Sequence, residues 1–125
     1  MIYAEKGKEQ DCFIDFVEKA LGILAKEKYQ EFLAVFDSSR ILTEQDLIFA
    51  LQYFDETRPV LKIDDPKQVK SQNQKIDLFT FRDGSGYCMD YDLTTDGKIN
   101  DLTLQIEFLK KGNGYTVSLD DLHTL

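Results

Sequence analysis

The spacing of apolar residues changes once along this chain, near Lys75, and this change constrains the fold more than any other feature. In residues 11–54, well before Lys75, apolar residues recur every three or four positions, which is typical of helices with one buried face. After it, apolar and polar residues alternate, which is typical of strands with one buried face. Helices followed by strands predict an α+β fold, in which helices cover one face of a sheet.

Residues 11–54 form the predicted helical part of the chain. The first and clearest helix covers 11–29, a short second helix covers 30–36, and a third covers 44–54. The stripe that we expect the first helix to bury consists of Phe13, Phe16, Val17, Ala20, Leu21 and Leu24.

Two positions in the helical part carry local signals. Thr43 precedes the third helix as a candidate N-cap, and Asp46 takes the place of the Glu or Gln that completes a capping box. A glycine inside a helix, such as Gly22, costs about 1 kcal/mol relative to alanine. Gly22 therefore marks either a close contact between the first helix and the sheet or a tolerated glycine.

Residues 55–75 contain both prolines and no clear period, so we expect a loop with at most one short edge strand, at 60–63. Glycine-containing turns separate the strands that follow, which predicts a curved antiparallel meander of four strands, or of five if 60–63 joins it. The four strands are expected at 76–82, 87–93, 102–110 and 115–122. With 125 residues the chain has room for one domain, residues 1–125. This order of elements resembles the nuclear-transport-factor-two-like and cystatin-like folds.

Alternation assigns the strand residues of 76–125 to two faces. The apolar and aromatic face, which we expect to meet the helices, consists of Tyr87, Met89, Tyr91, Leu93, Leu102, Leu104, Ile106, Phe108, Tyr115, Val117 and Leu119. The polar and acidic face consists of Cys88, Asp90, Asp92, Thr103, Gln105, Glu107, Thr116, Ser118 and Asp120. The first strand is ambiguous, because Leu78, Phe79 and Phe81 are apolar on both parities.

The chain shows no pattern of an enzyme or a metalloprotein. Its single histidine, His123, is two residues from the end of the sequence, and Cys12 and Cys88 lack the spacing of a zinc or redox motif. The glycine turn at 83–86 connects two strands rather than opening a helix, so it does not predict a phosphate site. We expect no catalytic residue, no metal, no cofactor and no enzymatic activity, and two reduced cysteines in a cytoplasmic protein.

Two other function classes remain as alternatives. A pocket between sheet and helix could hold a ligand or an acid with a raised pKa beside Tyr87, Tyr91 and Tyr115, but the strand acids lie on the opposite parity and point away from these phenols. A homodimer could bury the exposed sheet face against a second copy, so we expect a monomer or a weak homodimer.

The charge distribution favours a basic protein as partner. The net charge is −8, and residues 76–125 hold nine acids against four bases. Nucleic acids and anionic membranes bind basic surfaces, so we expect neither, and no long apolar run suggests a membrane span. The candidate partner-binding residues are Asp90, Asp92, Glu107, Asp120 and Asp121.

The last third of the chain resembles small immunity proteins of bacterial contact-dependent growth-inhibition and related polymorphic toxin systems. The resemblance is carried by Gly86-Tyr87, Asp90-Tyr91-Asp92, Asp101-Leu102-Thr103 and Asp121-Leu122-His123. It implies a cytosolic protein that binds and blocks the C-terminal domain of a toxin delivered by a neighbouring cell. Such toxins are often basic nucleases, which an acidic surface would suit.

Overall fold

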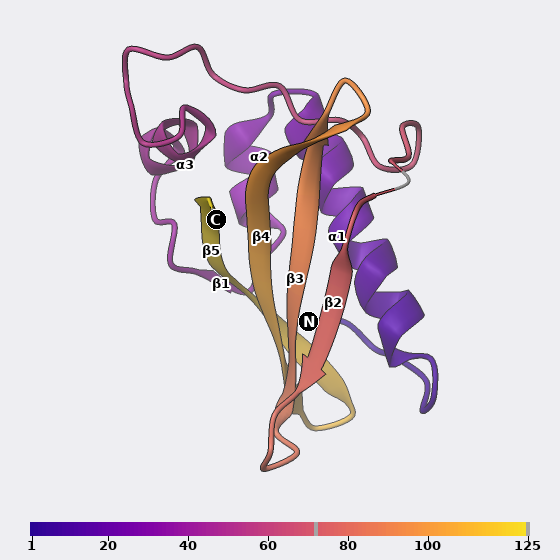
Figure 1. The fold of residues 1–125 in the computed structure, drawn as a ribbon. Coiled ribbons are helices and arrows are strands. Elements are labelled where there is room, and N and C mark those ends of the chain that lie inside the picture. The colour runs from indigo at the N-terminus through magenta and orange to yellow at the C-terminus, as the bar shows by residue number, and fades with distance from the viewer. Residues whose placement is uncertain (72, 125) are drawn as a thin grey trace.

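A computed structural model describes residues 1–71 and 73–124 as an α+β fold with three helices and a five-stranded mixed sheet (Figure 1). Gln72 of the predicted loop and Leu125 at the end of the predicted sheet part lie outside the described residues. The helices are α1 (Glu9–Ala25), α2 (Tyr29–Ala34) and α3 (Glu44–Leu51), and the strands are β1 (Ser38–Ser39), β2 (Ile76–Thr80), β3 (Gly86–Thr95), β4 (Lys98–Lys111) and β5 (Gly114–Thr124).

The sheet has the order β1-β5-β4-β3-β2. β2 pairs antiparallel with β3, β3 with β4, and β4 with β5. β1 pairs in parallel with β5, so the sheet is mixed rather than wholly antiparallel. The predicted edge strand at 60–63 is wrong. Its Leu61 N–H bonds to the carbonyl of Leu51, at the end of α3, at 2.8 Å, and the short polar segment Ser38–Ser39 supplies the fifth strand instead.

The three helices form where the periodicity predicts them, but they end earlier. α1 stops at Ala25 rather than at residue 29, and Glu27 then adopts a φ of 61° that a helix does not allow. α3 stops at Leu51 because Tyr53 and Phe54 have φ values of 54° and 60°.

Both local signals of the helical part can now be assigned. Thr43 caps α3 as predicted, since its Oγ1 accepts a hydrogen bond from the Asp46 N–H at 3.1 Å. Gly22 does not touch the sheet. A Cβ at this position would lie 3.4 Å from Oδ2 of Asp65, so the glycine faces the loop that follows α3.

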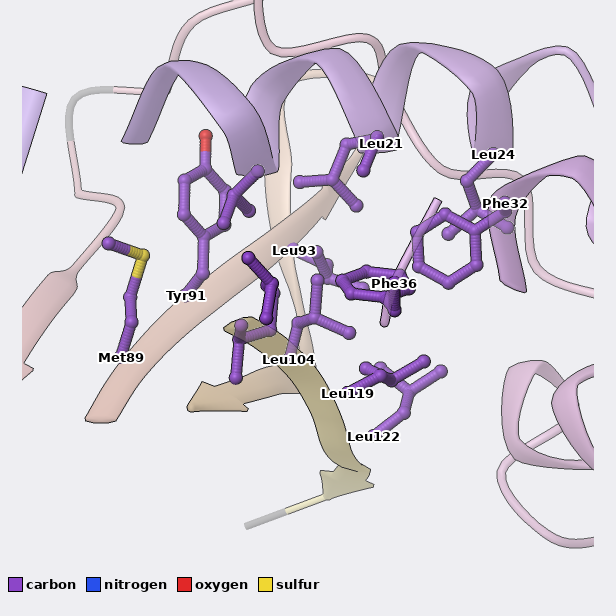
Figure 2. Packing of buried hydrophobic residues seen from close by; sticks show 14 of the residues in the cluster. Leu21, Leu24, Phe32, Phe36, Met89, Tyr91, Leu93, Leu104, Leu119 and Leu122 are labelled. Carbon is purple, nitrogen blue, oxygen red and sulfur yellow. The ribbon is translucent and has the colours of Figure 1, made fainter. Parts of the chain in front are cut away.

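One hydrophobic core lies between the helices and the inner face of the sheet (Figure 2). Within it the ring of Phe13 from α1 stacks on that of Phe108 from β4, with 4.0 Å between centroids. The predicted stripe of α1 is buried apart from the half-buried Phe16, and the predicted apolar sheet face is buried apart from the half-buried Tyr87. In β2, Ile76 and Leu78 pack against the core.

The helices of the described residues include none that is both long enough and apolar enough to cross a membrane.

Candidate functional site

The sheet surface that faces away from α1 and α2 is called here the outer face. Figure 1 is seen from this side, with β3 and β4 drawn in front of these two helices. The strand register places on it Asp77, Phe79, Cys88, Asp90, Asp92, Thr103, Gln105, Glu107, Thr116, Ser118, Asp120, Asp121 and His123. All five predicted partner-binding residues therefore lie on one surface.

A β-bulge in β5 brings two consecutive acids to this surface. Gln105 of β4 pairs with Asp121, but the next residue, Ile106, pairs with Leu119, so the register shifts by one residue at Asp120. Leu119 and Leu122 are both buried although two residues separate them. The extra residue lets Asp120 and Asp121 both face outward, which strict alternation does not predict.

Hydrogen bonds from the sheet fix the orientation of the β3 carboxylates. Gln105 Nε2 donates to Asp90 Oδ1 at 3.1 Å, and the backbone N–H of Lys75 donates to Asp92 Oδ2 at 3.2 Å. Thr103 Oγ1 donates to Asp92 Oδ1 at 3.4 Å. Both aspartates are thus held in place before any partner arrives.

A groove of about 350 Å³ runs over this part of the outer face. Three carboxylates from β2 and β3 line it. The basic residue Lys75 and the titratable residue His123 line it as well. The full lining consists of Asn73, Lys75, Asp77, Asp90, Asp92, Ile99, Thr103 and His123. We call it the acidic groove.

Glu107 of β4 and Asp120 of β5 form a second acidic group on the outer face. Burial raises the pKa of Glu107, the neighbouring Asp120 carboxyl raises it further through a hydrogen bond and its charge, and Arg40 opposes the increase. Two carboxyl groups are therefore held close together, and an additional cation would stabilise both.

Cys88 lies between these two acidic groups and reports on the potential there. Burial raises the pKa of its thiol to about 11, and the charges of Asp90, Asp120 and Glu107 contribute to the increase. The thiol is accordingly protonated at neutral pH and is a poor nucleophile.

His123 also lies on the outer face, where Nδ1 is 3.2 Å from Asp121 Oδ2. The register places it beside Thr103 of β4. Across residues 1–71 and 73–124, no group of three or more His, Cys, Asp or Glu side chains is arranged to hold a metal ion.

The inner face contains phenol–carboxylate contacts that the sequence reasoning missed. The hydroxyl of Tyr91 donates to Glu18 Oε2 at 2.9 Å, and Figure 2 shows it pointing toward α1. The hydroxyl of Tyr87 lies 3.5 Å from Glu9 Oε2. The strand acids do lie on the face opposite these phenols, as expected, and the acids that contact the phenols come from α1, for which the sequence analysis made no prediction.

The contact between Tyr91 and Glu18 is partly buried, and Lys70 shares it. Burial raises the pKa of Tyr91, and the adjacent Glu18 carboxylate raises it further. Lys70 Nζ lies 3.4 Å from the same Glu18 oxygen, so this cluster ties the loop before β2 to α1 and the sheet.

A pocket of about 370 Å³ lies at the Glu9 end of the inner face. Burial raises the pKa of Tyr115 in this pocket, and Tyr87 and Glu9 add to the effect. The lining consists of Ala4, Lys6, Glu9, Tyr87, Lys110, Gly112, Asn113, Gly114 and Tyr115. The alternative of a ligand-binding function requires a polar pocket of this kind.

Comparison of this sequence with protein families gives a match over most of its length. Residues 21–125 match the family described as "Domain of unknown function (DUF7668)". No curated protein and no solved structure shows a significant match to this sequence.

Proposed function

We propose that this chain, which belongs to the DUF7668 family, is an immunity protein that binds and neutralises a basic nuclease toxin through its outer face. The observation that carries the proposal is the arrangement of five acids on the sheet surface that faces away from α1 and α2: Asp90, Asp92, Glu107, Asp120 and Asp121. The resemblance of the last third of the chain to immunity proteins of contact-dependent growth-inhibition systems supports it.

The electrostatics of the outer face suit a cationic protein surface. Opposite charges raise association rates, and a desolvated charge pair at the centre of an interface can contribute several kcal/mol. The Glu107–Asp120 pair has a neighbouring base in Arg40, but burial and the Asp120 carboxyl still raise the pKa of Glu107, so an incoming Lys or Arg would relieve the repulsion between the two acids.

Neutralisation in this proposal needs no chemistry from the chain. A nuclease binds the phosphates of its substrate with basic residues. An acidic protein that occupies those residues, or a surface next to them, blocks substrate binding without a catalytic group. We propose accordingly that the chain is not an enzyme and that it acts in the cytoplasm, where a delivered nuclease would meet nucleic acid. Helix α1 lying along one face of the sheet also supports the proposed likeness to nuclear-transport-factor-two-like or cystatin-like folds.

Co-purification with the toxic C-terminal domain encoded immediately upstream tests the proposal. The double substitution Asp90→Asn and Asp92→Asn removes two charges and keeps side-chain size, and each asparagine keeps one of the two acceptor oxygens. We expect it to weaken binding at least about tenfold, or about 1.4 kcal/mol, with little change in the thermal unfolding midpoint of the free chain.

The matched control removes two charges away from the outer face, by Glu31→Gln in α2 and Glu56→Gln in the loop after α3. Both side chains are exposed. Equal weakening by the test pair and the control pair would show a general effect of net charge. Unchanged toxin binding by the test pair would show that the acidic groove is not part of the interface.

The pocket at Glu9 favours a second candidate function, a small-ligand-binding or enzymatic domain. Its phenols and carboxylate offer hydrogen bonds, while Lys6 and Lys110 offer positive charge. Saturable binding of a small molecule that is lost on Glu9→Gln and retained on Glu31→Gln would favour this candidate.

A further inference from the structure

The free edge of β2 suggests how the partner binds, an inference that rests on the proposed function. We infer that the toxin domain adds a β-strand to the edge of β2 and that basic side chains on alternate residues of this strand enter the acidic groove. The inference depends on two separate observations, an unpaired strand edge and the carboxylates directly beside it.

The first observation is that, among residues 1–71 and 73–124, β2 is the last strand of the sheet and pairs with β3 alone. Hydrogen bonds at both ends of the strand fix which residues face β3: Asp92 N donates to Lys75 O at 3.0 Å, and Phe81 N donates to Gly86 O at 3.0 Å. In an antiparallel pair, hydrogen-bonded residues alternate with residues whose backbone groups point away.

The residues of β2 that point away from β3 follow from this alternation. Asp77 and Phe79 lie two positions from Lys75 and Phe81, respectively, so their backbone groups also face β3. Leu78 and Thr80 alternate with these residues, so their backbone N–H and C=O groups are directed to the free edge. These groups are the donors and acceptors that an added strand uses.

The chain covers the other edge of its sheet. β1 pairs with β5 through Ser38 and Ser39, and Ile2 forms a separate bridge with Tyr115. The Asp37 N–H also donates to the Val117 carbonyl at 2.8 Å. Proteins generally cover or block sheet edges because an exposed edge pairs with other chains. Covering of one edge but not the other is consistent with a binding role for β2.

The second observation is the position of the acidic groove. Asp77 lies on β2 itself, and Asp90 lies opposite it on β3. Strands in a sheet are about 4.8 Å apart, so a Lys or Arg on an added strand beside Asp77 would reach Asp90 on the next strand. Phe79, which is 53% exposed on the same face, would pack against the aliphatic part of such side chains.

Charge favours a basic partner at this edge over a second copy of the chain. Two copies joined through β2 would form one continuous sheet with their outer faces side by side. The acidic grooves of the two copies would then be neighbours, and each chain carries a net charge of −8. A basic strand meets no such repulsion.

Amide hydrogen exchange tests the inference with the full chain and the purified toxic C-terminal domain encoded immediately upstream. In the free chain, we expect the amides of Leu78 and Thr80 to exchange rapidly, while those of Asp77 and Phe79 are protected by β3. In the complex, Leu78 and Thr80 should become protected. Protection of these two amides in the isolated chain that increases with protein concentration would assign the edge to a second copy and overturn the inference.

A pair of substitutions at Thr80 provides the second measurement. Thr80→Pro removes the N–H that points to the edge and leaves the hydrogen bonds with β3, and proline is tolerated in edge strands. Thr80→Val keeps the N–H and the β-branched shape. We expect Thr80→Pro to weaken toxin-domain binding at least about tenfold, as loss of an edge hydrogen bond and of strand docking predicts, and Thr80→Val to bind like the wild type.

The outcomes separate this inference from the proposed function. If the wild type binds the toxin domain but Thr80→Pro binds equally well and the two amides stay exposed, strand addition is wrong and the immunity function stands. If the wild type neither binds nor protects cells, the proposed function fails and the inference fails with it.

Discussion

Gly86, the first residue of β3, pairs with Leu109 of β4 at a position where the β4 backbone leaves no room for a side chain. A Cβ at this position would overlap the backbone carbonyl oxygen of Phe108, which cannot move without disturbing the ladder between β3 and β4. We expect Gly86→Ala to lower the free energy of unfolding by about 2–3 kcal/mol, measured by denaturant titration.

Gly22→Ala serves as the control for Gly86→Ala, because its expected effect on stability is not a loss. It is a helix-interior glycine whose added Cβ would make an ordinary contact with the Asp65 side chain. Gly22→Ala should leave stability unchanged or raise it by up to about 1 kcal/mol. Equal loss of stability from both substitutions would contradict this account of Gly86.

The thiol of Cys88 provides a chemical probe of the charge on the outer face. Its pKa is raised to about 11, so little thiolate exists near pH 8.5 and alkylation by iodoacetamide is slow. Removing a negative charge stabilises the thiolate and lowers the pKa. In a Cys12→Ser background, we therefore expect Asp90→Asn to increase the alkylation rate severalfold, as followed by mass spectrometry.

The same assay has a control in the helical part. Glu31→Gln removes one charge from α2, away from the sheet face that holds Cys88, and should leave the alkylation rate unchanged. A rate that responds equally to both substitutions would mean that the acids beside Cys88 do not control its pKa.

At the scale of elements, the N-cap of α3 tests how a local sequence signal stabilises the fold. The Thr43 side chain accepts the Asp46 N–H, which has no partner inside the helix. Thr43→Ala should lower the free energy of unfolding by about 1 kcal/mol, whereas Thr43→Ser, which keeps the acceptor, should cost much less. Equal losses from the two substitutions would show that the hydroxyl does not cap the helix.

The elements that could be predicted are those with a local periodic signal. All three helices and the four long strands follow from apolar spacing. β1 has no such signal, since two serines after Asp37 resemble a helix stop, and their pairing with β5 depends on residues about 80 positions away in the sequence. Alternation of apolar and polar residues does not predict the bulge at Asp120 either, although the positions of Leu119 and Leu122 on either side of two acids are consistent with it.

At the scale of the whole molecule, the acidic face could be predicted and the phenol–carboxylate contacts could not. The acids at 90, 92, 107 and 120 each alternate with the apolar residues of their own strand, so alternation alone places them on the face opposite the core. Glu9 and Glu18 meet Tyr87 and Tyr91 only because α1 lies across the inner face. The sequence fragment around either glutamate gives no indication of that tertiary placement.

The central claim, that the outer face neutralises a toxin, is tested most directly by growth of cells that express the upstream-encoded toxic domain together with this chain. We predict growth with the wild type and with the Glu31→Gln, Glu56→Gln control, and growth arrest with the Asp90→Asn, Asp92→Asn variant at equal protein level. Growth arrest with the wild type would contradict the immunity function. Full rescue by the Asp90→Asn, Asp92→Asn variant would contradict the role of the acidic groove.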